Sequence, residues 1–160
     1  MAQTTPYKFL AHENKCILIP YLCLALTLPT WASLGENAVS VQNDRVHMKG
    51  TLRSAATQRY VRCEIQVPTG QIVREFVGPG GKVFGVAWEG PFQPDLQQAL
   101  GPYFERMKQA VAAQRRHGHG PISVETPGFV FNQGGHARNF RGRAFVPDMV
   151  PAGVDVSEIR

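Results

Sequence analysis

The segment that most constrains the fold is Tyr60–Pro91, whose pattern predicts three strands joined by two turns. Tyr60–Val67 alternates apolar and polar residues without interruption, the period of two that is typical of a half-buried strand. A Pro-Thr-Gly turn then leads into a second strand at Ile72–Val77. A glycine-rich breaker precedes a third strand at Lys82–Trp88, which is apolar on both faces and is therefore expected to be central in a sheet. The segment predicts a β-meander.

A long amphipathic helix is predicted over Pro94–Arg116, because its apolar residues recur at helical spacing. Pro94 and Asp95 suit the first turn, and Gly101-Pro102 predicts a kink or a break, since the proline ring crowds the preceding turn. The small residues Gly85 and Ala87 on one face of the third strand would let this helix lie close to the sheet.

Weaker signals flank these elements. A short helix beginning near Ser40 is expected in the segment from Ser33 to Ala56, and Gly50–Thr57 is interpreted as a connection into the meander. After the helix, two short apolar runs, a turn at Asn132–Gly135 and a last strand at Ala137–Val146 predict a second hairpin. Beyond Pro147 the chain is expected to drape over the surface or to end in one short turn.

Together these elements predict an α+β domain: an antiparallel sheet of about five strands, made of the meander and the second hairpin, with one main helix packed on one face. Arg74 and Glu75 are adjacent on a strand and so point to opposite faces. If the helix covers Arg74, Glu105 is a candidate partner for an ion pair.

The first residues have the order of a secretory signal peptide, with lysines, then an apolar run, then small residues that end at Ala32. A membrane anchor is the alternative, but the apolar run is shorter than the ~20 residues that a spanning helix needs. Residues 1–32 are therefore predicted to be a signal peptide, and 33–160 a single soluble domain in the periplasm or outside the cell. Cleavage would leave Cys63 as the one thiol, either buried in the core or reactive.

Several stretches resemble one bacterial family. They are SLG at Ser33–Gly35, the run from Ile65 to Leu96 with its VREF, VAWEGP and PDL pieces, LGPYF at Leu100–Phe104, and the run from Gly134 to Val154. The chain is similar here to the domain-of-unknown-function family 2844. The resemblance implies an exported protein of Gram-negative bacteria and implies no activity, so it assigns no functional residues.

Histidines provide the one candidate metal site, which would consist of His117, His119 and His136. Neutral imidazoles bind zinc or copper, and three that converge can hold a catalytic ion. No carboxylate or thiol stands at ligand spacing, and a His-Gly-His sequence in a glycine-bounded loop is usually solvated. No cofactor is expected.

Arginines provide a candidate anion or partner contact at Arg138, Arg141 and Arg143, together with Arg115 and Arg116. Strand alternation places Arg141 and Arg143 on one face of the last strand. The alternative is a solvated edge strand that is kept from pairing by its charge. The formal net charge of +5 permits attraction to anionic polymers without requiring it.

The sequence favours a noncatalytic binding or assembly module of the bacterial envelope over an enzyme, because no convergent catalytic groups can be recognised. The expected partner is an envelope protein or an anionic envelope polymer. Neither nucleic acid nor, after signal cleavage, a membrane span is expected. The alternative function is that of a metal-dependent enzyme using the histidine cluster.

Overall fold

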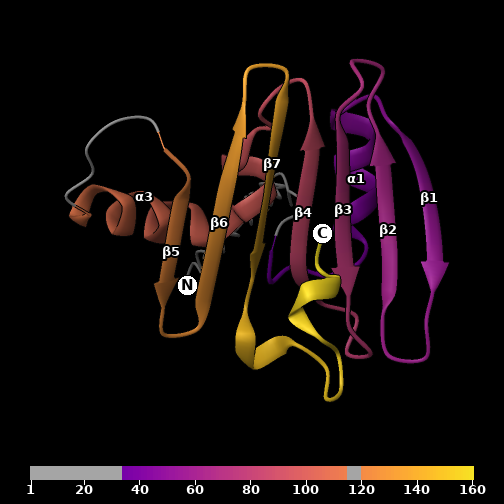
Figure 1. Cartoon of the computed structure of the whole chain (residues 1–160). Coiled ribbons are helices and arrows are strands. Elements are labelled where there is room, and N and C mark those ends of the chain that lie inside the picture. The colour runs from indigo at the N-terminus through magenta and orange to yellow at the C-terminus, as the bar shows by residue number, and fades with distance from the viewer. Residues whose placement is uncertain (1–33, 115–119) are drawn as a thin grey trace, which may run out of the picture.

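A computed structural model describes residues 34–114 and 120–160, which form a seven-stranded antiparallel sheet with helices on one face (Figure 1). The strand order is β1-β2-β3-β4-β7-β6-β5. The strands are β1 (Thr51–Ala56), β2 (Val61–Gln66), β3 (Ile72–Val77), β4 (Val83–Gly90), β5 (Ile122–Thr126), β6 (Phe129–His136) and β7 (Asn139–Phe145). Two meanders, β1 to β4 and β5 to β7, therefore join where β4 pairs with β7. The predicted α+β antiparallel class is confirmed, with more strands than expected.

The helical layer covers one face of this sheet, behind it in Figure 1. The short helix α1 spans Ser40–His47, as expected, although Val39 rather than Ser40 occupies its N-cap. The main helix runs as α2 (Leu96–Leu100), the 3₁₀ turn η1 (Gly101–Tyr103) and α3 (Phe104–Ala113). The predicted break at Gly101-Pro102 is thus confirmed.

Both ends of the main helix differ slightly from the prediction. Asp95 lies at the N-cap, where its carboxylate accepts hydrogen bonds from the N–H groups of Gln97 and Gln98 at 2.9 and 3.2 Å. Pro94 therefore lies before the helix rather than in its first turn. The helix ends at Ala113, and Arg115 and Arg116 lie outside the described residues.

The core lies between the sheet and the helices, and Trp88 on β4 is its largest buried side chain, with 1% of its surface exposed. Its ring centroid is 5.8 Å from that of Phe131 on β6. Cys63 is buried in the same layer, as its place in the alternating strand predicted. The helices lie on the face of Val86 and Trp88, so the expectation that they pack against Gly85 and Ala87 was wrong.

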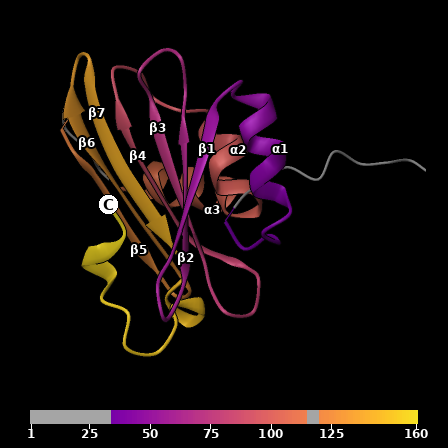
Figure 2. The same cartoon turned by 90° about the vertical axis from the view of Figure 1, so that its right-hand side faces the viewer.

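The face of Gly85 and Ala87 is instead covered in part by the C-terminal segment, the strap, which comprises residues 147–160 (Figure 2). The strap contains two short 3₁₀ turns, η2 (Pro147–Met149) and η3 (Val156–Glu158), and so drapes over the surface as expected. Ile159 is fully buried, and its side chain lies within 3.1 Å of the point where a Cβ on Gly85 would stand. A larger residue at Gly85 would therefore displace the strap.

Two elements were misplaced by the sequence patterns. Gly50–Thr57, interpreted as a connection, contains the edge strand β1, whose residues are exposed apart from the half-buried Leu52. The turn expected at Asn132–Gly135 is part of β6, and the chain reverses at Ala137 and Arg138, where Arg138 adopts a φ of 67°. In both places the local residue types gave the wrong signal, because neighbouring strands determine the pairing.

Glu75 points into the helical layer, where it is 1% exposed and meets Asp44 of α1, which is also 1% exposed. Burial raises the pKa of Glu75 well above its usual range, and the charge of Asp44 and a hydrogen bond with it add to this effect. Gln98 of α2 donates to Asp44 from its side-chain amide. A polar cluster thus links β3 to both helices inside the core.

Candidate functional site

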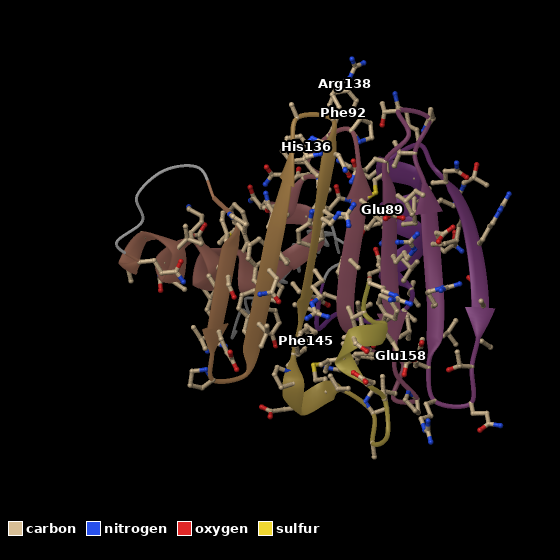
Figure 3. The ribbon with its side chains drawn as sticks, in the orientation of Figure 1. Glu89, Phe92, His136, Arg138, Phe145 and Glu158 are labelled. Carbon is tan, nitrogen blue, oxygen red and sulfur yellow. The ribbon has the colours of Figure 1, made fainter. Side chains whose placement is uncertain are left out.

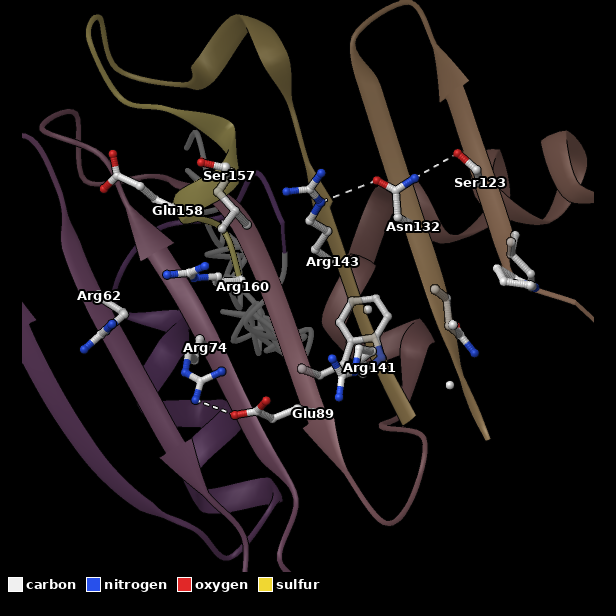
Figure 4. A pocket seen from close by; sticks show the side chains of 18 of the residues that line it. Arg62, Arg74, Glu89, Ser123, Asn132, Arg141, Arg143, Ser157, Glu158 and Arg160 are labelled. Atoms are coloured by element: carbon white, nitrogen blue, oxygen red, sulfur yellow. Dashed lines mark hydrogen bonds and ion pairs between the residues drawn. The ribbon is translucent and has the colours of Figure 1, made fainter. Parts of the chain in front are cut away.

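The sheet face opposite the helices carries a groove with a volume of about 1040 Å³. Its floor is formed by strands β2, β3, β4, β7 and β6, and the end of the strap forms one wall (Figure 4). Eight charged side chains line the groove. They are Arg62, Arg74, Arg141, Arg143, Arg160, Glu64, Glu89 and Glu158. Five guanidinium groups therefore face three carboxylates.

Among ion pairs between described residues, Arg74 is the groove arginine that carboxylates neutralise. Its Nε lies 2.8 Å from Glu64 Oε2 on β2, and a terminal nitrogen lies 2.7 Å from Glu89 Oε1 on β4. Burial lowers the pKa of Arg74, but the hydrogen bonds to Glu89 and Glu64 outweigh this and raise the pKa above its ordinary value. Glu105 was a candidate partner only if the helix covered Arg74. Arg74 instead faces away from the helices, and Glu105 pairs with Lys108.

Arg143 is held by uncharged partners. One guanidinium nitrogen donates to the Val156 carbonyl of the strap at 2.9 Å, and Nε approaches Asn132 Oδ1 at 3.5 Å. The Asn132 amide in turn donates to Ser123 Oγ at 2.9 Å. Carbonyl and amide oxygens carry no net charge, so these contacts position Arg143 without forming an ion pair.

Arg62, Arg141 and Arg160 face the same groove from β2, β7 and the strap (Figure 4). Within the described ranges, none of the three has a carboxylate oxygen within ion-pair distance. A terminal nitrogen of Arg141 makes a long polar contact, 3.5 Å, with Asn139 Oδ1. These guanidinium groups are therefore available to an external anion.

Polar contacts fix the strap against the groove. The Tyr60 hydroxyl donates to Glu158 Oε2 at 2.7 Å, and this hydrogen bond and partial burial raise the pKa of Tyr60. Asp155 and Glu158 form a capping box around η3. Hydrogen bonds from Ser157 lower the pKa of Asp155, and the charge of Arg143 acts in the same direction. These contacts hold the strap in place as one wall of the groove.

The structure brings together only part of the predicted site. Arg141 and Arg143 share one face of β7 and line the groove, but β7 lies between β4 and β6, so the alternative of a charged edge strand was wrong. Arg138 lies at the β6–β7 turn, two residues after His136 (Figure 3). Arg115 and Arg116 lie outside the described residues and are not placed.

The candidate metal site is not assembled in the part of the chain that is placed. His117 and His119 fall outside the described residues, and His136 is exposed on β6. Among residues 34–114 and 120–160, no three His, Cys, Asp or Glu side chains are close enough to hold a metal ion. Over the same residues, no helix has both the length and the apolar character needed to cross a membrane.

Sequence reasoning missed Arg62, Arg160 and Tyr60 as groove residues. Arg62 was visible as an outward residue of its strand, but the same pattern is typical of any solvated face. Arg62 shares the open sheet face with Arg141 only because β4 pairs with β7, and these two strands are separated in the sequence by α2, α3, β5 and β6. No local motif marks that pairing.

The fold and the groove define the class of this protein as a small α+β domain with helices on one sheet face and a cationic open face on the other. The model of the family described as "Protein of unknown function (DUF2844)" matches residues 30–159, and the chain belongs to this family. No curated protein and no solved structure matches the chain. The family supplies no activity, so any function has to be inferred from the groove itself.

Proposed function

We propose that the protein is a noncatalytic binding module of the bacterial envelope, and that its open-face groove holds a segment of an anionic envelope polymer. The observation that carries the proposal is a set of open-face guanidinium groups without a carboxylate partner among the described residues, namely those of Arg62, Arg141 and Arg160. Arg143 lies on the same face and is held by neutral groups. A guanidinium binds carboxylate or phosphate oxygens through paired N–H donors.

The distribution of the donors favours an extended ligand over a small ion. The arginines lie on β2, β7 and the strap, and neighbouring strands are about 4.8 Å apart, so the cations are spread across several strands. Ser123 and Asn132 extend the same surface with hydroxyl and amide groups that suit sugar hydroxyls. A carboxylated polysaccharide offers both charges and hydroxyls along its length.

The proposed location rests on the order of charged, apolar and small residues in Met1–Ala32. Mass spectrometry of the protein recovered from its host is expected to find a chain beginning near Ser33 in the envelope or secreted fraction. An intact Met1 in the cytosolic fraction would exclude the proposed location.

Binding is expected to depend on the uncompensated arginines. Replacing Arg141 by alanine should weaken the binding of an oligogalacturonate by about tenfold, which corresponds to about 1.4 kcal/mol for one charge-assisted contact. Glu89→Gln should strengthen binding, because it frees one side of Arg74 from its ion pair. Isothermal titration calorimetry at low salt measures both changes.

Two controls separate the groove from general charge attraction. Arg45→Ala removes the same charge from α1, on the helical side of the sheet, and should leave the affinity unchanged. A neutral oligosaccharide of equal length should bind at least tenfold more weakly than the uronate. Equal losses for Arg141→Ala and Arg45→Ala would show that net charge, and not the groove, accounts for the binding.

A further inference from the structure

The two edges of the sheet differ in their protection. At β5, α3 packs against the strand, and the Gln114 side chain donates to the backbone carbonyl of Ser123 at 2.6 Å. At β1 the register with β2 is continuous, without a bulge, and the strand has no proline and a single charged residue, Arg53. Edge strands of natural proteins usually carry a bulge, a proline or several charged residues, which hinder pairing with another chain. Within the described part of the chain, the β1 edge has none of them apart from Arg53.

The backbone of β1 offers a defined set of hydrogen-bonding groups. The N–H of Thr57 donates to the carbonyl of Tyr60 at 2.8 Å, which makes this residue pair a hydrogen-bonded one at the end of the β1–β2 ladder. In an antiparallel ladder, hydrogen-bonded and non-hydrogen-bonded pairs alternate. The N–H and C=O groups of Leu52, Ser54 and Ala56 therefore point away from β2, towards the open edge.

We propose that β1 pairs in antiparallel orientation with β1 of a second copy of this chain, about a twofold axis at Ser54. In this register, Ser54 lies opposite its own counterpart, Leu52 lies opposite Ala56, and Arg53 lies opposite Ala55. The outward groups of Leu52, Ser54 and Ala56 then form the hydrogen-bonded pairs. No like charges face each other.

Neighbouring registers are less favourable. An axis at Arg53 places two arginines directly opposite each other, which is destabilising. An axis at Ala55 moves Leu52 opposite Gln58, beyond the end of the strand. The side chains thus select the axis at Ser54.

The pairing joins the two sheets into one. Directly opposite residues of an antiparallel pair point to the same face, so the open faces of both copies lie on the same side. If the groove binds a polymer as proposed above, the dimer presents two grooves to one chain and gains affinity through effective concentration. The pairing itself does not depend on that function.

Disulfide trapping tests the register directly. Ser54→Cys in a Cys63→Ala background should form a covalent dimer under mild oxidation, because the Cα atoms of a hydrogen-bonded pair are about 5.5 Å apart, within disulfide range. The Cys63 change is needed because Ser54 Oγ lies 3.6 Å from Cys63 Sγ in the same chain. Ala56→Cys in the same background is the control, since its counterpart would lie about 13 Å along the strands.

Sedimentation of the purified protein provides a second, independent measurement. The wild type should have the mass of two chains and dissociate on dilution. Residue 55 faces Arg53 of the other copy, so Ala55→Arg should weaken the dimer at least tenfold. For the same reason, Ala55→Glu should strengthen the dimer. Both changes also face Arg62 within one chain, so thermal unfolding of dilute monomer measures that effect separately. A wild type that stays monomeric at every concentration, equal trapping of both cysteine variants, or a dimer unaffected by either Ala55 change would overturn the proposal.

Discussion

Replacing Trp88 by alanine is expected to lower the free energy of unfolding by about 3–5 kcal/mol, the range for deleting a large buried aromatic side chain. Trp88 is 1% exposed and lies on the central strand β4, where both meanders and the helical layer meet. Gly142 on β7 leaves room for its ring, since a Cβ there would stand 2.3 Å from Trp88 Cζ2. The alanine variant would leave a cavity at the junction of the two halves.

Trp88→Phe is the matched control for this experiment. The indole N–H has no hydrogen-bond partner among the described residues, so phenylalanine removes an unpaired donor while keeping most of the apolar contacts. Its loss of stability should be less than half that of the alanine variant. Urea unfolding measures both, and a loss below about 1 kcal/mol for Trp88→Ala would contradict a core centred on this residue.

Replacing Glu75 by glutamine is expected to abolish a loss of stability that the wild type shows as the pH rises. The pKa of Glu75 is raised well above its ordinary value of 4.5 in the folded protein, first by burial and then by Asp44. Over the interval between these two pKa values, the folded state keeps a proton that the unfolded chain has released. The free energy of unfolding therefore falls with rising pH, by up to about 1.4 kcal/mol per pH unit for one proton.

The Glu75→Gln variant keeps the size of the side chain and a donor for Asp44 but cannot ionise. The difference in unfolding free energy between variant and wild type should grow in favour of the variant from pH 4.5 upwards and level off above the folded pKa. The pKa of Asp155 is lowered, so Asp155 makes the free energy of unfolding rise with pH, over a lower pH range. Because both proteins contain Asp155, the difference between them cancels this contribution. A constant difference between the two proteins from pH 4 to 9 would contradict a buried, protonated Glu75.

The sequence predicted an element best where the structure of that element depends on residues that are close together in the chain. The strand β2 follows from uninterrupted alternation, and β3 and β4 follow from apolar runs bounded by turn residues, with Ile72–Val77 predicted to the residue. The break at Gly101-Pro102 follows from the geometry of proline alone. Such features depend on residues that are close in the chain.

Other features depend on which strands become neighbours, and the sequence could not show them. Ser54, Ala55 and Ala56 have no strong strand preference, yet they pair because β2 offers them a ladder. Gly134 and Gly135 look like a turn but lie in β6, opposite Arg141 and Phe140. Tertiary pairing overrides local preference at both places.

The candidate site was only partly predictable for the same reason. Arg141 and Arg143 were recognised from alternation along one strand, whereas Arg62 and Arg160 join them only through the pairing of β4 with β7 and the return of the strap. The neutralisation of Arg74 likewise depends on Glu64 and Glu89 from two neighbouring strands. A groove built from several strands leaves no compact motif in the sequence.

The most direct test of the account is to map where an oligogalacturonate touches the protein, using backbone amide NMR spectra recorded during a titration. The proposed groove predicts shifts confined to the open-face strands around Arg74, Arg141 and Arg143 and to the end of the strap from Ser157 to Arg160, and none in α1 or α3. Shifts concentrated in the helical layer, or no shifts at all at low salt, would contradict the proposal that the open sheet face is the binding surface.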